Sequence, residues 1–444
     1  RSFIALLSAP AAVALLQACS SSATTTSSPA SSDPSTSVAS GPWREARSSL
    51  PRAAADPALA APAARAVNAL SNELFGRLAA DETGNLVFSA ASVVLALAMT
   101  RAGALGVTAR EMDSALHANL TGSSPDALHT ALNSLSAALE SRNGEFTIGE
   151  QTQSVELTVA NALWGQNGIR WKAPFLDTLA TNYDAGMRLV DYRTAPEDAR
   201  SLINRWVDEQ TKQRIPELLA AGTITSSTLL ALVNAIYLKA AWLDPFSEAA
   251  TKQGPFTPLS GATKQVPVMH ASTELSYAAG DGWQLVELPY VGNSLAMTLL
   301  VPDADRSAEV ESKLASGLFD DALTQSATRQ VNLGVPKFDI ETKTQLSAIL
   351  AALGMPTAFD PDRADFTGMT DDQRLVIDLI IHQANITVDE NGTEAAAATA
   401  VVMVGTAAPS DPPVTLEIDR PFLFAVRDVP TGAVLFFGRV ADPT

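Results

Sequence analysis

Cysteine and basic residues are both scarce in this 444-residue sequence. It contains one cysteine, Cys19, so no disulfide can form within the chain. There are 30 Lys and Arg against 48 Asp and Glu, which gives a formal net charge of −18 at pH 7. Nucleic-acid binding needs clustered Lys and Arg to neutralise phosphates, and the sequence has no run of them. We therefore expect no nucleic-acid partner.

The common enzyme motifs are missing as well. The sequence has no HExxH, no GxSxG, no GxGxxG after a strand and no phosphate-binding loop. Its four histidines lack the paired spacing of metal ligands. We expect no metal site, no cofactor and no catalytic activity. Pairs of carboxylates are set by tertiary geometry and cannot be read from spacing, so an enzyme with a hidden acid/base pair remains an alternative.

The single cysteine stands at the end of a short apolar run, "SFIALLSAPAAVALLQACSSS". This run resembles the bacterial lipoprotein signal, in which small residues admit a peptidase and the cysteine sulfur carries diacylglycerol. A secretory signal with a chance cysteine and a membrane helix are the alternatives, but Pro10 interrupts the run, which is short for a span of ~20 residues. We expect residues 1–19 to be a lipoprotein signal peptide, with an incomplete N-terminus because the chain begins at Arg1. The protein would then be exported and lipid-anchored in the cell envelope, at the outer membrane or cell surface.

Low complexity continues after the cysteine. Residues 20–62 are mostly Ser, Thr, Ala and Pro and offer little apolar area to bury. Pro51, Pro57 and Pro62 argue against a long helix in this stretch. We predict a disordered tether over residues 20–62 and a folded domain over residues 63–444.

Within that domain, helical and strand patterns alternate without a linker or a repeat. Apolar spacing predicts helices at 66–79, 92–104, 126–140, 197–212 and 343–353. It predicts strands at 155–164, 229–238, 285–290, 294–301, 331–340 and 433–440. The run 229–238 is almost continuously apolar, which indicates a central strand covered on both faces. We expect one α+β domain with at least one large sheet.

One stretch near the C-terminus fits no single structure: "VDENGTEAAAATAVVMVGTAAPSDPP", residues 388–413. Its uncharged part is too short to cross a membrane. Its β-branched residues, Gly405 and Pro409 oppose a helix, and alanine is uncommon in strands. Small side chains do let an extended segment enter between two existing strands without a clash. We predict a segment that is exposed in one state and a central strand in another.

The quoted stretch resembles the hinge of the serpins, the serine protease inhibitors. "DRPFLFAVRDVPTGAVLFFGRVADP" resembles their C-terminal strands, and "NLVFSAASVVLALAMTRAGALGVTAREM", "LVNAIYLKAAW" and "VPKFDIETKTQLSAILAALGM" extend the likeness over residues 63–443. The resemblance implies the serpin fold, with about nine helices and three β-sheets, a large central sheet A, an exposed reactive-centre loop and a metastable native state. A monomer is expected.

The resemblance also implies suicide-substrate trapping. A protease cuts the loop, forms an acyl-enzyme, and is dragged and distorted as the loop inserts into the central sheet. Family spacing places the reactive bond at Thr406 and Ala407, with Met403 and Val404 as alternative positions. None of these residues is basic, so we expect an elastase-like or subtilisin-like serine protease as the partner. A papain-like cysteine protease is a further possibility that the family allows.

Individual site residues carry over from the resemblance. The hinge would comprise Glu390, Gly392, Thr393, Glu394, Ala395, Ala396, Ala397 and Ala398. A polar and aromatic gate would comprise Ser89, Ser92, Asn234, His382, Trp242 and Lys337. Thr393 would be the first residue to enter the sheet, and Lys337 would pair with Glu390. Without the resemblance, His382 is interpreted as a hydrogen-bonded core histidine and Trp242 as a core tryptophan.

A serpin-fold protein that binds or stores without inhibiting is the alternative function. Non-inhibitory members tend to carry charged or bulky residues in the hinge, whereas residues 395–398 of this chain are all alanine. The hinge composition therefore favours inhibition.

Overall fold

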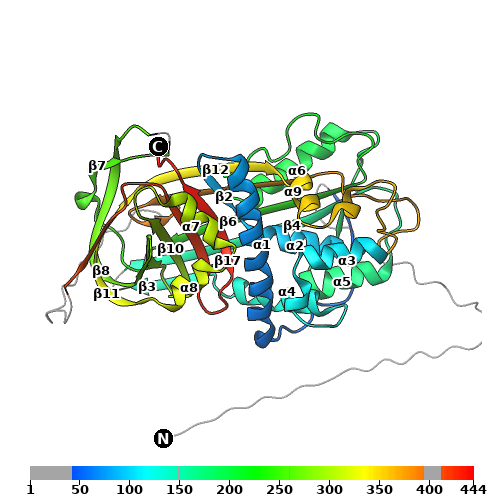
Figure 1. Ribbon diagram of the computed structural model, residues 1–444. Coiled ribbons are helices and arrows are strands. Elements are labelled where there is room, and N and C mark those ends of the chain that lie inside the picture. Colours follow the sequence, from blue (N-terminus) through cyan, green and yellow to red (C-terminus); the bar gives the residue numbers. More distant parts are fainter. Residues whose placement is uncertain (1–42, 149–150, 260, 395–411) are drawn as a thin grey trace, which may run out of the picture. The chain divides into compact units, whose positions relative to one another are not determined.

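The structure is a computed structural model that describes residues 43–148, 151–259, 261–394 and 412–444 (Figure 1). In these residues the chain forms nine α-helices, in agreement with the family expectation. Their bounds are α1 Ala60–Asp81, α2 Ala90–Arg101, α3 Gly106–Ala115, α4 Ala127–Glu140, α5 Ala173–Tyr183, α6 Pro196–Gln210, α7 Ser307–Leu314, α8 Leu318–Thr324 and α9 Ser347–Ala352.

The first sheet has eight strands in the order β1-β5-β4-β6-β14-β13-β12, with β3 paired to β4. Their bounds are β1 Arg44–Ala46, β3 Gly144–Ile148, β4 Gln151–Gln166, β5 Met187–Val190, β6 Leu230–Ala241, β12 Phe338–Gln345, β13 Ile380–Asp389 and β14 Gly392–Thr393. Strand β6 lies inside this sheet, and all its residues except Lys239 are buried. The continuous apolar run at 229–238 thus correctly predicted a central strand.

The second sheet has nine strands in the order β15-β11-β8-β9-β10-β16-β17-β2, with β7 paired to β8. Their bounds are β2 Leu86–Phe88, β7 Lys252–Phe256, β8 Lys264–Gly280, β9 Trp283–Pro289, β10 Leu295–Pro302, β11 Ala327–Pro336, β15 Val414–Glu417, β16 Phe422–Asp428 and β17 Val434–Val440. Strand β8 pairs with β11 through one part and with β9 through another. Two of the three expected sheets are therefore joined here into one hydrogen-bonded path.

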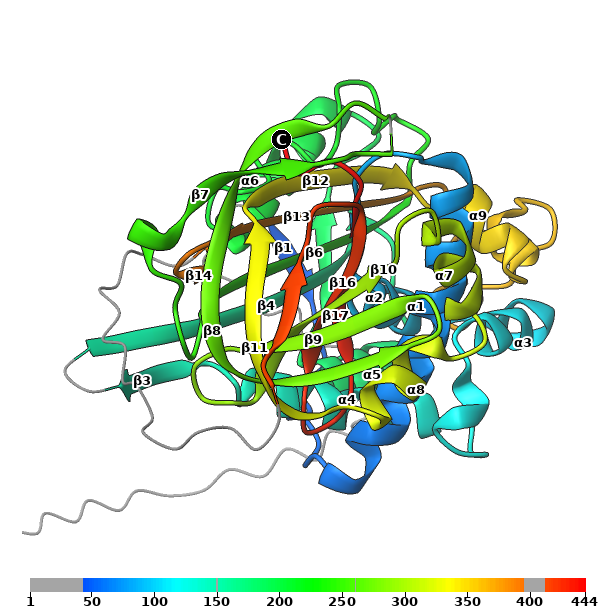
Figure 2. The same ribbon diagram turned by 60° about the vertical axis from the view of Figure 1, so that its left-hand side comes forward.

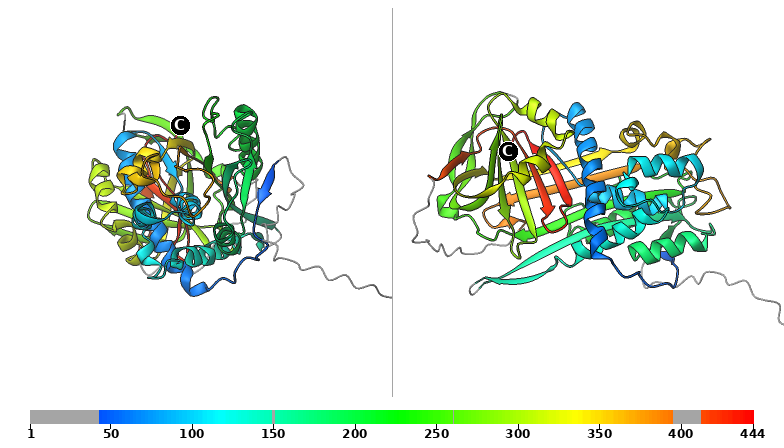
Figure 3. Two further views of the ribbon diagram at one scale, coloured as in Figure 1. Left: turned by 90° about the vertical axis from the view of Figure 1, so that its right-hand side faces the viewer. Right: turned by 60° about the horizontal axis from the view of Figure 1, so that its bottom comes forward.

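Helix α2 connects the two sheets at the centre of the core. It contacts β4 and β6 of the first sheet and β17 of the second, and every residue from Ala90 to Thr100 is buried. Helix α1 crosses the molecule beside it, with the strands of the second sheet on one side and helices α2 to α5 on the other (Figure 3). One face of the first sheet thus packs against α2. This helix is apolar on all sides, which is typical of a helix that is completely buried.

Residues 43–62 do not form the predicted tether. Strand β1 pairs with β5, Trp43 packs edge-on against Trp164, and Arg52 bonds to Glu140 at 2.7 Å. Pro62 lies in the first turn of α1, where a missing backbone N–H breaks no helical hydrogen bond. The low sequence complexity of residues 43–62 gave no sign of these contacts. The folded domain extends at least from Trp43.

Two predicted elements have different boundaries in the structure. The strand predicted at 331–340 is two strands, β11 and β12, which separate at Lys337 and belong to different sheets. The helix predicted at 343–353 begins only at Ser347, because residues 343–345 complete β12. Apolar alternation continues through both junctions, so periodicity alone could not show the change of partner.

In the part of the chain that the structure describes, no helix combines the length and apolar character needed to cross a membrane. Cys19 and the predicted signal peptide lie outside the described residues.

Candidate functional site

The first sheet is partly open between β6 and β13. These parallel strands pair at only three positions, Leu232–Ile380, Val233–Ile381 and Asn234–His382. Farther along, β14 lies between them, with Thr393 opposite both Ala240 and Val388. Between these two regions, residues 235–239 and 383–387 do not pair with each other. We call this unpaired stretch the slot; β14 marks its open end and the three pairs mark its closed end (Figure 2).

Gly392 and Thr393 have already entered the sheet at the open end. Gly392 has a φ of +149°, and a Cβ there would lie 2.1 Å from the carbonyl oxygen of Ala240, so only glycine fits. The Thr393 side chain is buried, and its Oγ1 lies 2.6 Å from the hydroxyl of Tyr290. The structure therefore places the predicted first residue of insertion inside the sheet before any cleavage.

Trp242 covers this open end. Its ring stacks on Tyr290 with centroids 4.5 Å apart and planes at 12°. Its Nε1–H donates to the carbonyl oxygen of Asp389 at 2.9 Å, and its backbone N–H donates to that of Asn391 at 2.9 Å. The tryptophan thus connects the end of β6 to the turn that leads into β14.

Glu390 fixes the other side of the turn. Lys337 Nζ and Thr251 Oγ1 each donate to one of its carboxylate oxygens at 2.7 Å. Burial opposes ionisation of Glu390, but the hydrogen bonds from Lys337 and Thr251 outweigh it and keep its pKa below the usual value. The predicted pairing of Lys337 with Glu390 is present.

A polar cluster lies at the closed end of the slot. His382 Nε2 accepts from the backbone N–H of Ser89 at 2.9 Å, so its Nδ1 carries the proton and donates to Asn234 Oδ1 at 2.7 Å. Burial lowers the pKa of His382 to about 4, which keeps the ring neutral at pH 7. Ser89 also caps α2 by accepting from the backbone N–H of Ser92 at 3.2 Å. Through these backbone and side-chain bonds, Ser89, Ser92, Asn234 and His382 connect α2, β6 and β13.

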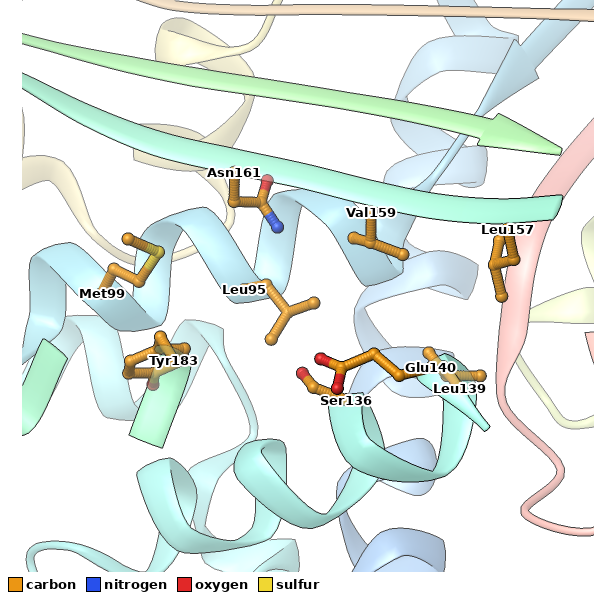
Figure 4. A pocket seen from close by; sticks show the side chains of 9 residues that line it. All are labelled: Leu95, Met99, Ser136, Leu139, Glu140, Leu157, Val159, Asn161 and Tyr183. Atoms are coloured by element: carbon orange, nitrogen blue, oxygen red, sulfur yellow. The ribbon is translucent and has the colours of Figure 1, made fainter. Parts of the chain in front are cut away.

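Asn161 of β4 belongs to this polar cluster, although the sequence did not point to it. It pairs in register with Asn234 and accepts from Ser92 Oγ at 3.3 Å. It also lines a cavity of about 110 Å³ beneath β4 (Figure 4). The other lining residues come from α2, α4, α5 and β4: Leu95, Met99, Ser136, Leu139, Glu140, Leu157, Val159 and Tyr183.

The predicted site residues thus form two groups at opposite ends of the slot. Ser89, Ser92, Asn234 and His382 gather at the closed end, whereas Trp242, Lys337, Glu390, Gly392 and Thr393 gather at the open end. Glu394 is the last described residue of the hinge. Ala395, Ala396, Ala397, Ala398, Met403, Val404, Thr406 and Ala407 lie outside the described residues.

Tyr290, Thr251 and Arg214 also contact the hinge, and sequence reasoning missed all three. Thr251 and Tyr290 lie more than a hundred residues from their partners in the chain. Arg214, which contacts Glu394, is also remote from it in the sequence. Spacing along the sequence carries no signal for such long-range contacts; only the sheet register brings them together.

Comparison with known proteins agrees with this architecture. The family model described as Serpin (serine protease inhibitor) matches residues 65–443, nearly the whole described domain. The chain is a serpin.

Named relatives of this serpin include inhibitors. It is 34% identical over 370 residues to the human leukocyte elastase inhibitor, covering 81% of this chain and 93% of that protein. It is 34% identical over 383 residues to an uncharacterised serpin-like protein of Thermococcus kodakarensis, covering 86% of each. Family membership and these relatives support protease inhibition as the general activity of the chain, with serine proteases as the partners that such inhibitors imply.

Solved structures confirm the serpin fold. The native state of tengpin, a thermophilic serpin, matches with a TM-score of 0.75 and 27% identity, covering 88% of this chain and 96% of that one. Thyroxine-binding globulin in complex with thyroxine matches with a TM-score of 0.74 and 27% identity, covering 85% and 99%. The fold therefore occurs in a protein that binds a small ligand as well as in inhibitors.

Proposed function

We propose that this serpin traps a serine protease as a suicide substrate and is consumed in the reaction, and is therefore an inhibitor and not an enzyme. Cleavage near Thr406 and Ala407 forms an acyl-enzyme, and the freed loop inserts between β6 and β13. The single observation that carries this proposal is the slot, which already holds Gly392 and Thr393 at its open end.

The register of β14 predicts where each hinge residue goes. Thr393 pairs with Ala240 and Val388, and the closed end begins six positions farther along both strands, at Asn234 and His382. Continued in the same register, Thr399 would pass between Asn234 and His382. The alanines at 395–398 would fill the part of the slot that is already unpaired, where small side chains enter without moving either strand.

Contacts at the closed end of the slot oppose the last part of the insertion. Residues 399–401 would separate the three pairs that now join β6 and β13, and the hydrogen bond between His382 and Asn234 would break. In exchange the new strand pairs on both sides, and the stretch from Thr393 to Thr406 spans ~46 Å as a strand. The balance therefore favours the inserted state once cleavage frees the loop.

The residues at the proposed bond suggest the target. Thr406 and Ala407 are small and uncharged, and the alternative positions Met403 and Val404 are apolar. Such side chains suit a shallow apolar pocket, whereas a trypsin-like pocket with a buried Asp needs a basic residue. An elastase-like or subtilisin-like serine protease is therefore the proposed partner, and a papain-like cysteine protease is the second class to test.

The test is incubation with pancreatic elastase, subtilisin and papain, followed by a denaturing gel. The proposal predicts a covalent band at the summed mass with at least one of the serine proteases. Mass spectrometry of the released C-terminal peptide then identifies the cleaved bond. Clean cleavage by all three proteases without that band would reject trapping and favour the alternative, a non-inhibitory serpin-fold binding protein.

We also propose that the protein is exported and anchored to the envelope through lipid on Cys19. Residues 20–42 would then form a flexible tether with a root-mean-square span of ~25–30 Å. The sequence around Cys19 is the support for this proposal. Mass spectrometry of the N-terminal peptide from the native host is the test, and a Cys19 peptide without diacylglycerol would reject it.

A further inference from the structure

The open slot is covered by a segment that follows α6. Arg214 lies in this segment, and its contacts extend to β12, to β13 and to the hinge. Its carbonyl oxygen accepts from Asn385 Nδ2 at 2.9 Å, and its guanidinium donates to Thr387 Oγ1 at 2.6 Å. Asn385 and Thr387 both belong to the part of β13 that borders the slot. One residue therefore contacts two positions along the unpaired edge of β13.

The same guanidinium holds the hinge. Arg214 Nε lies 2.5 Å from Glu394 Oε1, and the Glu394 side chain is only 13% exposed. Glu394 has a φ of +52°, a left-handed conformation that is unfavourable for a residue with a side chain. A strand needs φ near −120° to −140°. The ion pair therefore accompanies a backbone conformation in which the chain turns out of the strand immediately after Thr393.

The surroundings of this ion pair are mostly protein. Burial raises the pKa of Glu394, although Arg214, Tyr237 and Lys239 oppose the change. Asp339 of β12 lies 3.4 Å from the Arg214 guanidinium and, as a nearby negative charge, also raises the pKa of Glu394. Burial makes the Glu394 carboxylate depend on Arg214, because removing one partner of a partly buried ion pair leaves the other charge without compensation.

We propose that Arg214 is the latch that keeps the hinge from inserting beyond Thr393. The latch would set the rate of insertion in this serpin, and the proposal rests on the proposed function. To extend β14 by one residue, Glu394 must rotate to a strand conformation between Lys239 and Thr387, the next positions in the register. Its present contact with Arg214 is made in the left-handed conformation and must break or rearrange.

The covering segment must also move. By strand alternation, Glu394, Ala396 and Ala398 would face the side on which Arg214 lies, since Thr393 faces the core. Ala396 would then pass Asn385, whose amide is now bonded to the Arg214 carbonyl. These contacts stabilise the state before insertion and are not available unchanged afterwards. Their loss should therefore speed insertion.

The experiment measures insertion without a protease. The purified serpin is mixed with excess synthetic peptide EAAAATAVVMVGT, the sequence of residues 394–406, whose first residue takes the strand position next to Thr393. Peptide uptake is followed as the growth of a species with a higher melting temperature and a shifted band on a native gel. The Arg214→Met variant is expected to take up the peptide at least about fivefold faster than the parent protein.

Arg306→Met is the matched control. The exposed fractions of the two side chains are nearly equal, 31% for Arg306 and 32% for Arg214. Arg306 also forms ion pairs, with Asp281 and Glu309. Arg306 immediately precedes α7, and its ion-pair partners Asp281 and Glu309 lie outside the strands that border the slot. Its variant should take up the peptide at the parent rate. Equal acceleration in both variants would show general destabilisation and would overturn the latch.

A double-mutant cycle isolates the ion pair. Glu394→Gln alone should accelerate uptake, and adding it to Arg214→Met should change the rate by less than about twofold, because the shared contact is already gone. Arg214→Lys keeps the charge and should give an intermediate rate. An Arg214→Met rate at or below the parent rate, or fully additive effects of the two substitutions, would overturn the proposal.

The latch and the trapping function can fail separately. Faster peptide uptake by Arg214→Met with no covalent protease complex in any variant would support the latch and reject trapping. A covalent complex with unchanged peptide uptake would support trapping and reject the latch.

Discussion

The hydroxyl groups of Tyr290 and Thr393 lie 2.6 Å apart, and both side chains are buried at the open end of the slot. Tyr290 comes from the turn after β9 and Thr393 from β14, so this contact joins the hinge to the second sheet. The hinge therefore starts from a partly inserted position. Insertion after cleavage would extend an existing strand and would not need to nucleate a new one.

Thr393→Arg should convert the inhibitor into a substrate. The guanidinium would replace a small hydroxyl side chain that is buried against Tyr290, and burying a charge without a partner is strongly unfavourable. The hinge would be expelled from the sheet, and hydrolysis would outpace insertion. We expect the yield of covalent complex to fall at least about tenfold while the rate of loop cleavage is maintained.

Thr393→Val is the companion variant. It has a similar volume but leaves the Tyr290 hydroxyl without this partner, which costs about 1–3 kcal/mol. Trapping should persist with a lower melting temperature. If Thr393→Arg forms complex as efficiently as Thr393→Val, the position does not enter the sheet during inhibition.

The stability of the protein should fall below neutral pH because of His382. Burial lowers its pKa from 6.5 to about 4 in the folded protein. Between these values the unfolded chain binds more protons, so the contribution is complete above pH 6.5 and is lost as the pH falls towards 4. The loss amounts to about 3 kcal/mol at pH 4, and denaturant unfolding at several pH values measures it.

His382→Gln separates this effect from other titrating groups. His129 is also buried with its pKa lowered to about 4, and it contributes the same slope to both proteins. The variant should therefore be less stable at pH 7 but lose less stability between pH 6.5 and pH 4. Parallel stability curves for the two proteins would show that His382 is protonated freely in the fold.

The pattern of apolar residues was sufficient to predict those helices and strands that depend only on their own stretch of sequence. The apolar run of β6 and the helical spacing of α1, α2 and α4 are properties of their own residues, and the structure confirms them. The closed-end cluster around His382 is different, because its members come from α2, β6 and β13. Only the family resemblance brought these residues together, and periodicity would have left His382 as a core histidine.

The mistaken tether at residues 43–62 and the overlooked Arg214 have the same physical cause: both depend on contacts between residues that are distant in the sequence. Residues 43–62 average to low complexity, yet Trp43 and Arg52 supply contacts that depend on partners at Trp164 and Glu140. Arg214 is informative only because the fold brings Glu394 and Thr387 to it. A sequence shows which side chains can pair, whereas the sheet register decides which of them meet.

Trp43 should stabilise the domain from outside the predicted boundary. It packs against Trp164, and the Arg188 guanidinium lies 5.1 Å from its ring centre. Trp43→Ala removes this ring and one face of the aromatic surroundings of Arg188, at a cost of about 2 kcal/mol. Leu50→Ala, at an exposed position in the same segment, should cost less than ~0.5 kcal/mol. Equal melting temperatures for the two variants would contradict an integrated N-terminal segment.

The thermal stability of the cut protein tests the central claim most directly. A protease that is not trapped, or a brief digestion, can sever the loop between residues 395 and 411, and the melting temperatures of severed and intact protein are then compared. If residues 394–406 insert between β6 and β13, the severed protein melts at a clearly higher temperature, because the sheet then contains an additional central strand that pairs with both neighbours. A severed protein that melts at or below the temperature of the intact one would contradict the account.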